Sequence, residues 1–133
     1  MHKLAALFAA AAALASVATV ASAKGPTTAE RNEARLATML DGRTAGEPRH
    51  CISAMDSNKL EVIEYVGMVY DAGDTIYVAR AHNPRMLGSS ETPIVQRTGS
   101  TLCTSDVTRT FDQHSGMTGV VFLDDFVPYT KQG

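Results

Sequence analysis

Two cysteines, Cys51 and Cys103, most limit how this chain can fold. An even number of cysteines in an exported chain favours one disulfide bond. The bond would close a loop of about 50 residues, and the entropy it removes from the unfolded chain is worth about 4 kcal/mol. That is a large share of the roughly 5–15 kcal/mol by which a typical domain is stable. We therefore expect a small domain that depends on this bond.

The N-terminal segment, residues 1–23, has the three parts of a secretory signal peptide. Lys3 supplies a positive charge, Leu4 to Ala15 is an unbroken apolar run, and Ala21-Ser22-Ala23 is a small-residue cleavage site. The apolar run is shorter than the about 20 residues that a membrane-spanning helix needs. We expect cleavage after Ala23, no membrane span in the remaining chain, and a location in the periplasm or outside the cell.

The chain that follows residue 23 is long enough for one domain and too short for two. Without Lys3 it has 11 basic and 14 acidic residues, a net charge of −3, and neither sign is clustered. Nucleic acid is therefore a poor partner, because it is bound by concentrated positive charge. The partner is otherwise open, and a protein or a small molecule is compatible with this composition.

Residues 24–50 predict one helix and a linker. Thr27 and Glu30 have the spacing of a capping box, in which each side chain accepts a hydrogen bond from the other residue's amide. A weak apolar stripe at helical spacing follows, and Gly42 is a natural end for the helix. We expect the helix at about residues 29–41, packed into one domain with residues 51–133.

Residues 51–133 predict short strands. The strand segments are rich in β-branched and aromatic residues and lie at 60–66, 68–70, 75–80, 94–99, 106–112 and 120–123, with an extended tail at 126–130. Gly73 suits a hairpin turn between the second and third segments. Pro128 predicts that this last segment is an edge strand or a tail. The fold class is therefore α+β and mostly β: one N-terminal helix, then about six short antiparallel strands in a sheet or partly open barrel, with one disulfide.

The stretch around Cys103 also raises the alternative of a thiol enzyme, with Asp106 and His114 as helpers. An oxidising compartment would consume the free thiol, and no cysteine-enzyme signature surrounds either cysteine. The histidines lack metal-ligand spacing, and no Gly-x-Ser-x-Gly motif is present. We therefore expect no catalytic residue, no metal site and no cofactor.

Arg80 is the most unusual polar residue of the predicted sheet. It shares a strand face with Ile76 and Val78, and an inward-facing arginine needs an acidic partner. Asp106 begins a later strand that the disulfide would hold nearby. We hypothesise that Arg80 and Asp106 form a partly buried ion pair that fixes the strand arrangement. The alternative is that Arg80 contacts a ligand in a small cleft.

Four short motifs, taken in order, resemble a family of small exported bacterial proteins that carry a domain of unknown function. They are Cys-Ile at Cys51, Tyr-Val-x-Arg ending at Arg80, Leu-Cys-x-x-Asp ending at Asp106, and Phe-Val-Pro-Tyr ending at Tyr129. The resemblance implies matched cysteines and a matched arginine and aspartate. Family members often have asparagine before the arginine, where this chain has Ala79. The resemblance implies no activity.

These observations favour an exported, non-catalytic binding or accessory module. The alternatives are a small hydrolase or thiol-dependent enzyme, and a structural envelope protein that acts through sheet edges. A binding module would expose an apolar or aromatic patch, for which Tyr77 and Tyr129 are the candidates. An enzyme would have a cleft with convergent polar groups, and an edge-pairing protein would have an uncovered strand.

Overall fold

The structure is a computed structural model and describes residues 24–106 and 108–132, so the predicted signal peptide lies outside the described residues. Its one α-helix, α1 (Thr28–Leu40), begins at the predicted capping box. The Glu30 amide donates to the Thr27 hydroxyl at 3.2 Å, and the Thr27 amide donates to the Glu30 carboxylate at 2.6 Å. Two short 3-10 helices, η1 (Ser57–Lys59) and η2 (Pro84–Leu87), lie between strands.

A five-stranded antiparallel sheet forms the centre of the molecule, with the strand order β1-β10-β5-β4-β3. Its strands are β1 (Arg43–Ala45), β3 (Leu60–Ile63), β4 (Gly67–Asp71), β5 (Thr75–Arg80) and β10 (Val127–Lys131). The predicted β4–β5 hairpin is confirmed, and Gly73 takes a φ of +93° in its turn.

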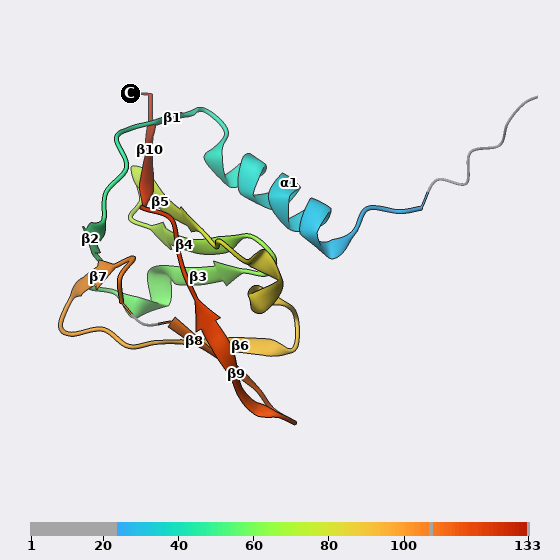
Figure 1. Cartoon of the computed structure of the whole chain (residues 1–133). Helices are drawn as coiled ribbons and strands as arrows, with labels where there is room; N and C mark the ends of the chain where they lie inside the picture. The colour runs from blue at the N-terminus through green and yellow to red at the C-terminus, as the bar shows by residue number, and fades with distance from the viewer. Residues whose placement is uncertain (1–23, 107, 133) are drawn as a thin grey trace, which may run out of the picture.

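Two smaller antiparallel sheets complete the fold (Figure 1). One pairs β2 (Cys51–Ser53) with β7 (Thr101–Cys103), and the other has the order β6-β8-β9. The strands of the second are β6 (Glu91–Val95), β8 (Thr108–Asp112) and β9 (Gly116–Val121). The predicted fold class, with one helix, antiparallel strands and one disulfide, is confirmed.

The central sheet separates two apolar cores because its strands alternate between its faces. On the face covered by α1, the buried residues are Leu36, Ile63, Val66, Val69, Ile76 and Val78. On the other face, Met68, Tyr70 and Ala79 pack with residues of the smaller sheets, including Ile52 and Leu102. The helix therefore lies on one side of the central sheet and the smaller sheets lie on the other.

The structure differs from the sequence prediction at the C-terminal strand. Pro128 does not lie at a sheet edge, because β10 pairs with β1 on one side and β5 on the other. The proline is tolerated because β1 ends at Ala45, opposite Tyr129, and so needs no amide from residue 128. The Pro128 carbonyl still accepts a hydrogen bond from the Gly46 amide at 2.7 Å. Residues 24–106 and 108–132 form ten strands instead of the about six predicted, partly because β1, β2 and β7 have only three residues each.

Candidate functional site

The disulfide between Cys51 and Cys103 is formed, and it links directly opposed residues of β2 and β7 with their Cα atoms 4.0 Å apart. Because these are the chain's only cysteines, neither can act as a thiol nucleophile. Asp106 and His114 have structural positions instead. Asp106 accepts a hydrogen bond from the Cys103 backbone amide at 2.7 Å, and His114 lies in the β8–β9 turn. The predicted disulfide is confirmed, and it leaves no free thiol for the nucleophile that the thiol-enzyme alternative requires.

The hypothesised Arg80–Asp106 ion pair is not formed. The Arg80 guanidinium instead donates to both carboxylate oxygens of Glu33 on α1, at 2.6 and 3.2 Å. The reason is the layering: Arg80 ends β5 on the side covered by α1, whereas Asp106 closes a local turn beside β7 on the other side. The prediction that Arg80 shares a face with Ile76 and Val78 is right, but its side chain is about half exposed at the end of that face.

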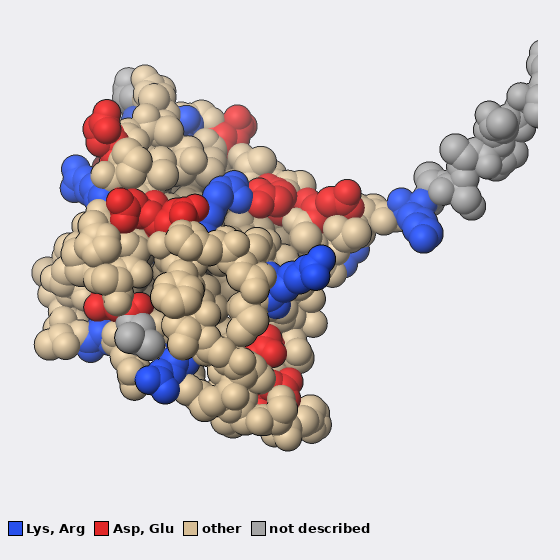
Figure 2. All heavy atoms as spheres, viewed as in Figure 1, with Lys and Arg blue, Asp and Glu red and all other residues tan. Residues whose placement is uncertain are grey.

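Two histidine–aspartate pairs lie close to Arg80. The His82 Nε2 is 2.6 Å from the Asp124 carboxylate, and the His50 Nδ1 is 3.1 Å from the Asp125 carboxylate. In Figure 2, acidic side chains (red) lie on both sides of a basic side chain (blue) on the surface next to α1. These pairs connect the segment between β9 and β10 to residues that precede β2 and follow β5.

The His50–Asp125 pair includes a hydroxyl, which brings together the residue types of a catalytic triad. The Thr104 hydroxyl is 2.9 Å from the His50 Nδ1 and donates to Asp125 at 3.1 Å. A hydrolase triad needs the imidazole to bridge acid and nucleophile through different nitrogens. Here both contacts use Nδ1, so the three groups close a local triangle. The hydrogen bond from His50, followed by that from Thr104, lowers the pKa of Asp125.

This triangle was not predicted from the sequence, although the two cysteines carry a signal for it. His50 precedes Cys51 and Thr104 follows Cys103, so antiparallel pairing of the cysteines places the two side by side. The Thr104 amide indeed donates to the His50 carbonyl at 2.9 Å.

The cleft beside Arg80 is small, at about 80 Å³, and is lined by Val78, Arg80, Asp124, Asp125, Val127 and Tyr129. Typical small-molecule sites are roughly 300–1,000 Å³. The volume has room for a few water molecules, and the guanidinium is already engaged by Glu33. The geometry therefore favours the structural role of Arg80 over the ligand-binding one.

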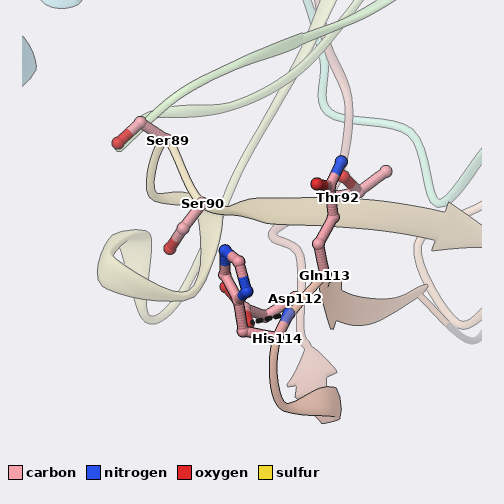
Figure 3. Close-up of a pocket in the computed structure, with 6 residues that line it drawn as sticks. All are labelled: Ser89, Ser90, Thr92, Asp112, Gln113 and His114. Carbon is pink, nitrogen blue, oxygen red and sulfur yellow. Dashed lines mark hydrogen bonds between the residues drawn. The ribbon is translucent and has the colours of Figure 1, made fainter.

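A larger pocket, of about 220 Å³, lies between the β8–β9 turn and the start of β6, and Figure 3 shows its six lining residues: Ser89, Ser90, Thr92, Asp112, Gln113 and His114. One Asp112 oxygen accepts hydrogen bonds from the amides of His114 and Ser115, at 2.8 and 2.9 Å, and from the Ser115 hydroxyl. The Ser115 amide, then its hydroxyl and the His114 amide, lower the pKa of Asp112. Asp112 is therefore ionised at neutral pH and holds the β8–β9 turn through these hydrogen bonds.

The outer face of the β6-β8-β9 sheet is exposed and apolar. Ile94 and Val120 flank Arg109 in one row of cross-strand partners, and Phe111 pairs with Met117 in another. The exposed fractions are 44% for Ile94, 38% for Phe111, 53% for Met117 and 43% for Val120. The inner face of β8 carries Thr108 and Thr110, which are at most 1% exposed. On β8 the threonines are therefore buried, beside the buried Val121 of β9, while the outer face of the sheet exposes apolar residues, which is unusual for a face turned to solvent.

A β-bulge in β9 creates the apolar face. Thr110 pairs with Gly119 and Phe111 pairs with Met117, so Thr118 is the extra residue. The Thr118 hydroxyl lies 2.8 Å from the Thr110 hydroxyl and donates to the Glu91 carboxylate, on the inner side. Regular alternation would put Met117 and Val120 on opposite faces, and the bulge puts both on the outer face.

The predicted surface aromatics are not the exposed ones. Tyr77 packs half-buried against the core shared with the smaller sheets, and Tyr129 packs against the core beneath α1. In the part of the chain that the structure describes, the large aromatic residues that are exposed are Phe111 on β8 and Phe122, which follows β9. They could not be predicted from the sequence because the face that a strand exposes depends on its pairing register.

Within residues 24–106 and 108–132, no group of three or more histidine, cysteine, aspartate or glutamate residues is arranged to hold a metal ion. No helix in these ranges is long and apolar enough to cross a membrane. Comparisons with protein-family models, curated proteins and solved structures found no match. The resemblance to small exported bacterial proteins therefore stays a prediction.

Proposed function

We propose that this protein is an exported, non-catalytic module that binds another protein through the outer face of the β6-β8-β9 sheet. The main support is that this face exposes Ile94, Phe111, Met117 and Val120, whereas Thr108 and Thr110 are buried on the inner face of β8. Contiguous exposed apolar groups on a small protein mark interaction sites. The disulfide supports an oxidising compartment, in agreement with the predicted signal peptide and a periplasmic or secreted location.

The chemistry of the face limits the partner. Arg109 is the only charged residue on the outer face of the three strands, and it lies between Ile94 and Val120. An arginine surrounded by apolar groups favours a partner surface that combines apolar side chains with a carboxylate. A basic partner would place like charges together at the centre of the interface.

Photo-crosslinking in the cells that produce the protein tests this proposal. A photoreactive amino acid replaces Phe111 on the face, and the control carries it at Ala37, which is exposed on α1. We expect a defined heterologous crosslinked product from position 111 only. Arg109→Glu should abolish the product and Arg109→Lys should retain part of it, because the charge is reversed in the first and kept in the second.

Two results would overturn the proposal. One is a product that forms equally from positions 111 and 37, and the other is a product from position 111 that is insensitive to Arg109→Glu. Export is tested separately by the intact mass of the protein from the same cells. A chain that begins at Lys24 with one intramolecular disulfide is expected, and a chain that retains residues 1–23 in the cytoplasm would contradict export.

A further inference from the structure

One edge strand of the described residues lacks the protection that the others have. The strands β1, β2 and β7 are three residues long, β3 contains Glu61 in an ion pair with Arg35 of α1, and β6 contains Pro93. Short length, charge and proline are the devices by which natural edges avoid pairing. The strand β9 has six residues, Gly-Met-Thr-Gly-Val-Val, with no charge and no proline.

The side of β9 away from β8 has no strand paired with it within the described residues. Within the described residues β9 pairs with β8 alone, and its contact with η2 lies toward the inner face, where a Cβ on Gly119 would meet Met86. Its bulge at Thr118 is the one remaining protective device, since a bulge twists an edge. That bulge also brings Met117 and Val120 to the exposed face, and so increases the apolar surface beside the edge.

We propose that β9 pairs antiparallel with β9 of a second copy of this chain. A two-fold interface must be self-complementary, and an antiparallel strand pair satisfies this by its geometry. In the register that places Met117 opposite Val120 of the second copy, the two-fold symmetry forms this pair of exposed apolar residues twice. Cross-strand apolar pairs of this kind stabilise a sheet.

The charges of the sheet fit the antiparallel orientation. Asp112 is paired with Gly116 at one end of β9, and Arg109 is paired with Val120 toward the other end. The two-fold arrangement brings the Asp112 end of one copy beside the Arg109 end of the other, and no like charges face each other across the new pair. The product is a continuous six-stranded sheet with both apolar faces on the same side. The inference thus deepens the proposed function by doubling the binding face.

Sedimentation velocity of the purified, disulfide-bonded protein tests the pairing, at concentrations up to about 1 mM. The wild type should show a monomer–dimer equilibrium. Val120→Lys should raise the dimer Kd about 100-fold or more, because it places two lysines at the edge. Ile94→Lys is the matched control: it adds the same charge to the same face, at 44% exposure against 43%, but on the far strand β6. Met117→Lys should behave like Val120→Lys, and thermal melting checks that each variant folds.

Hydrogen exchange supplies an independent readout. Amides of residues 117–120 should become more protected as concentration rises, whereas those of β6 should not. A wild type that stays monomeric overturns the inference, and so does a dimer that Ile94→Lys weakens as much as Val120→Lys, since that result indicates face-to-face packing. If the protein stays monomeric but position 111 still crosslinks to a partner, the β9 pairing is wrong and the proposed function is supported. If the protein dimerises but position 111 gives no crosslink, the β9 pairing is supported and the proposed function is wrong.

Discussion

Arg80 and Glu33 join the end of β5 to α1 through two hydrogen bonds, of 2.6 and 3.2 Å, between one guanidinium and one carboxylate. The hydrogen bond to Glu33 is the main reason why the pKa of Arg80 is raised above its ordinary value. The two residues are 47 positions apart, so the contact forms only when the helix packs on the sheet. It orients a helix whose one fully buried side chain is Leu36.

The Arg80–Glu33 contact is predicted to contribute little to stability. Both side chains are about half exposed, so solvent screens the attraction and the coupling should be at most about 1 kcal/mol. A double-mutant cycle of Arg80→Met and Glu33→Gln, measured by urea unfolding, gives this value directly. The coupling should shrink in high salt. A coupling of several kcal/mol would mean that the pair is far less solvated than its exposure indicates.

Removal of the disulfide should be much more damaging. Cys51 and Cys103 are 52 positions apart, and opening a loop of this length should cost about 4 kcal/mol through unfolded-state entropy. The double variant Cys51→Ala/Cys103→Ala and the reduced wild type should both show this loss in urea unfolding. The two strands that it joins have only three residues each and offer little compensation. An unfolding midpoint that does not change on reduction would contradict the prediction.

Gly67→Ala should disrupt the β4–β5 pairing. A Cβ at Gly67 would lie 2.2 Å from the Ala79 carbonyl oxygen and 2.8 Å from the Arg80 Cα, and backbone cannot move aside as a side chain can. We expect a loss of about 1–3 kcal/mol or more in free energy of unfolding. Gly25→Ala is the control, because its Cβ would have nothing within 4 Å and the change should stay within about 0.5 kcal/mol. Equal melting temperatures for the two variants would refute this account.

Asp125 should contribute to stability in a pH-dependent manner. Its pKa is lowered in the folded protein, chiefly by the hydrogen bond from His50, so the contribution is complete above the ordinary value of 3.8. The contribution is lost as the pH falls through the lowered folded value, because protonation then weakens the contacts. Carboxyl NMR titration should show the Asp125 pKa rising toward 3.8 in His50→Ala. A pKa that does not respond to this change would count against the triangle.

Local features of the fold could be predicted because their partners lie close in sequence. The capping box of α1 needs only Thr27 and Glu30, three positions apart. The β4–β5 hairpin needs a glycine that tolerates positive φ, which Gly73 supplies. The disulfide had only one possible pairing, since the chain has two cysteines.

The residues of the candidate site could not be predicted in this way. Arg80 had several acids as possible partners, and the choice of Glu33 depends on which face of the sheet α1 covers. The exposure of Phe111 depends on the register of β8, whose alternation alone does not say which face turns outward.

By itself, the sequence determined the helix start, the central hairpin, the disulfide and the mostly β class, because each follows from neighbouring residues or from a unique pair. Only the tertiary structure decided that the β6-β8-β9 sheet exposes its apolar side and leaves β9 uncovered. The physical reason is that strand exposure is a property of packing between distant segments. A single bulge residue, Thr118, changes which side chains share a face, and no local propensity specifies where it pairs.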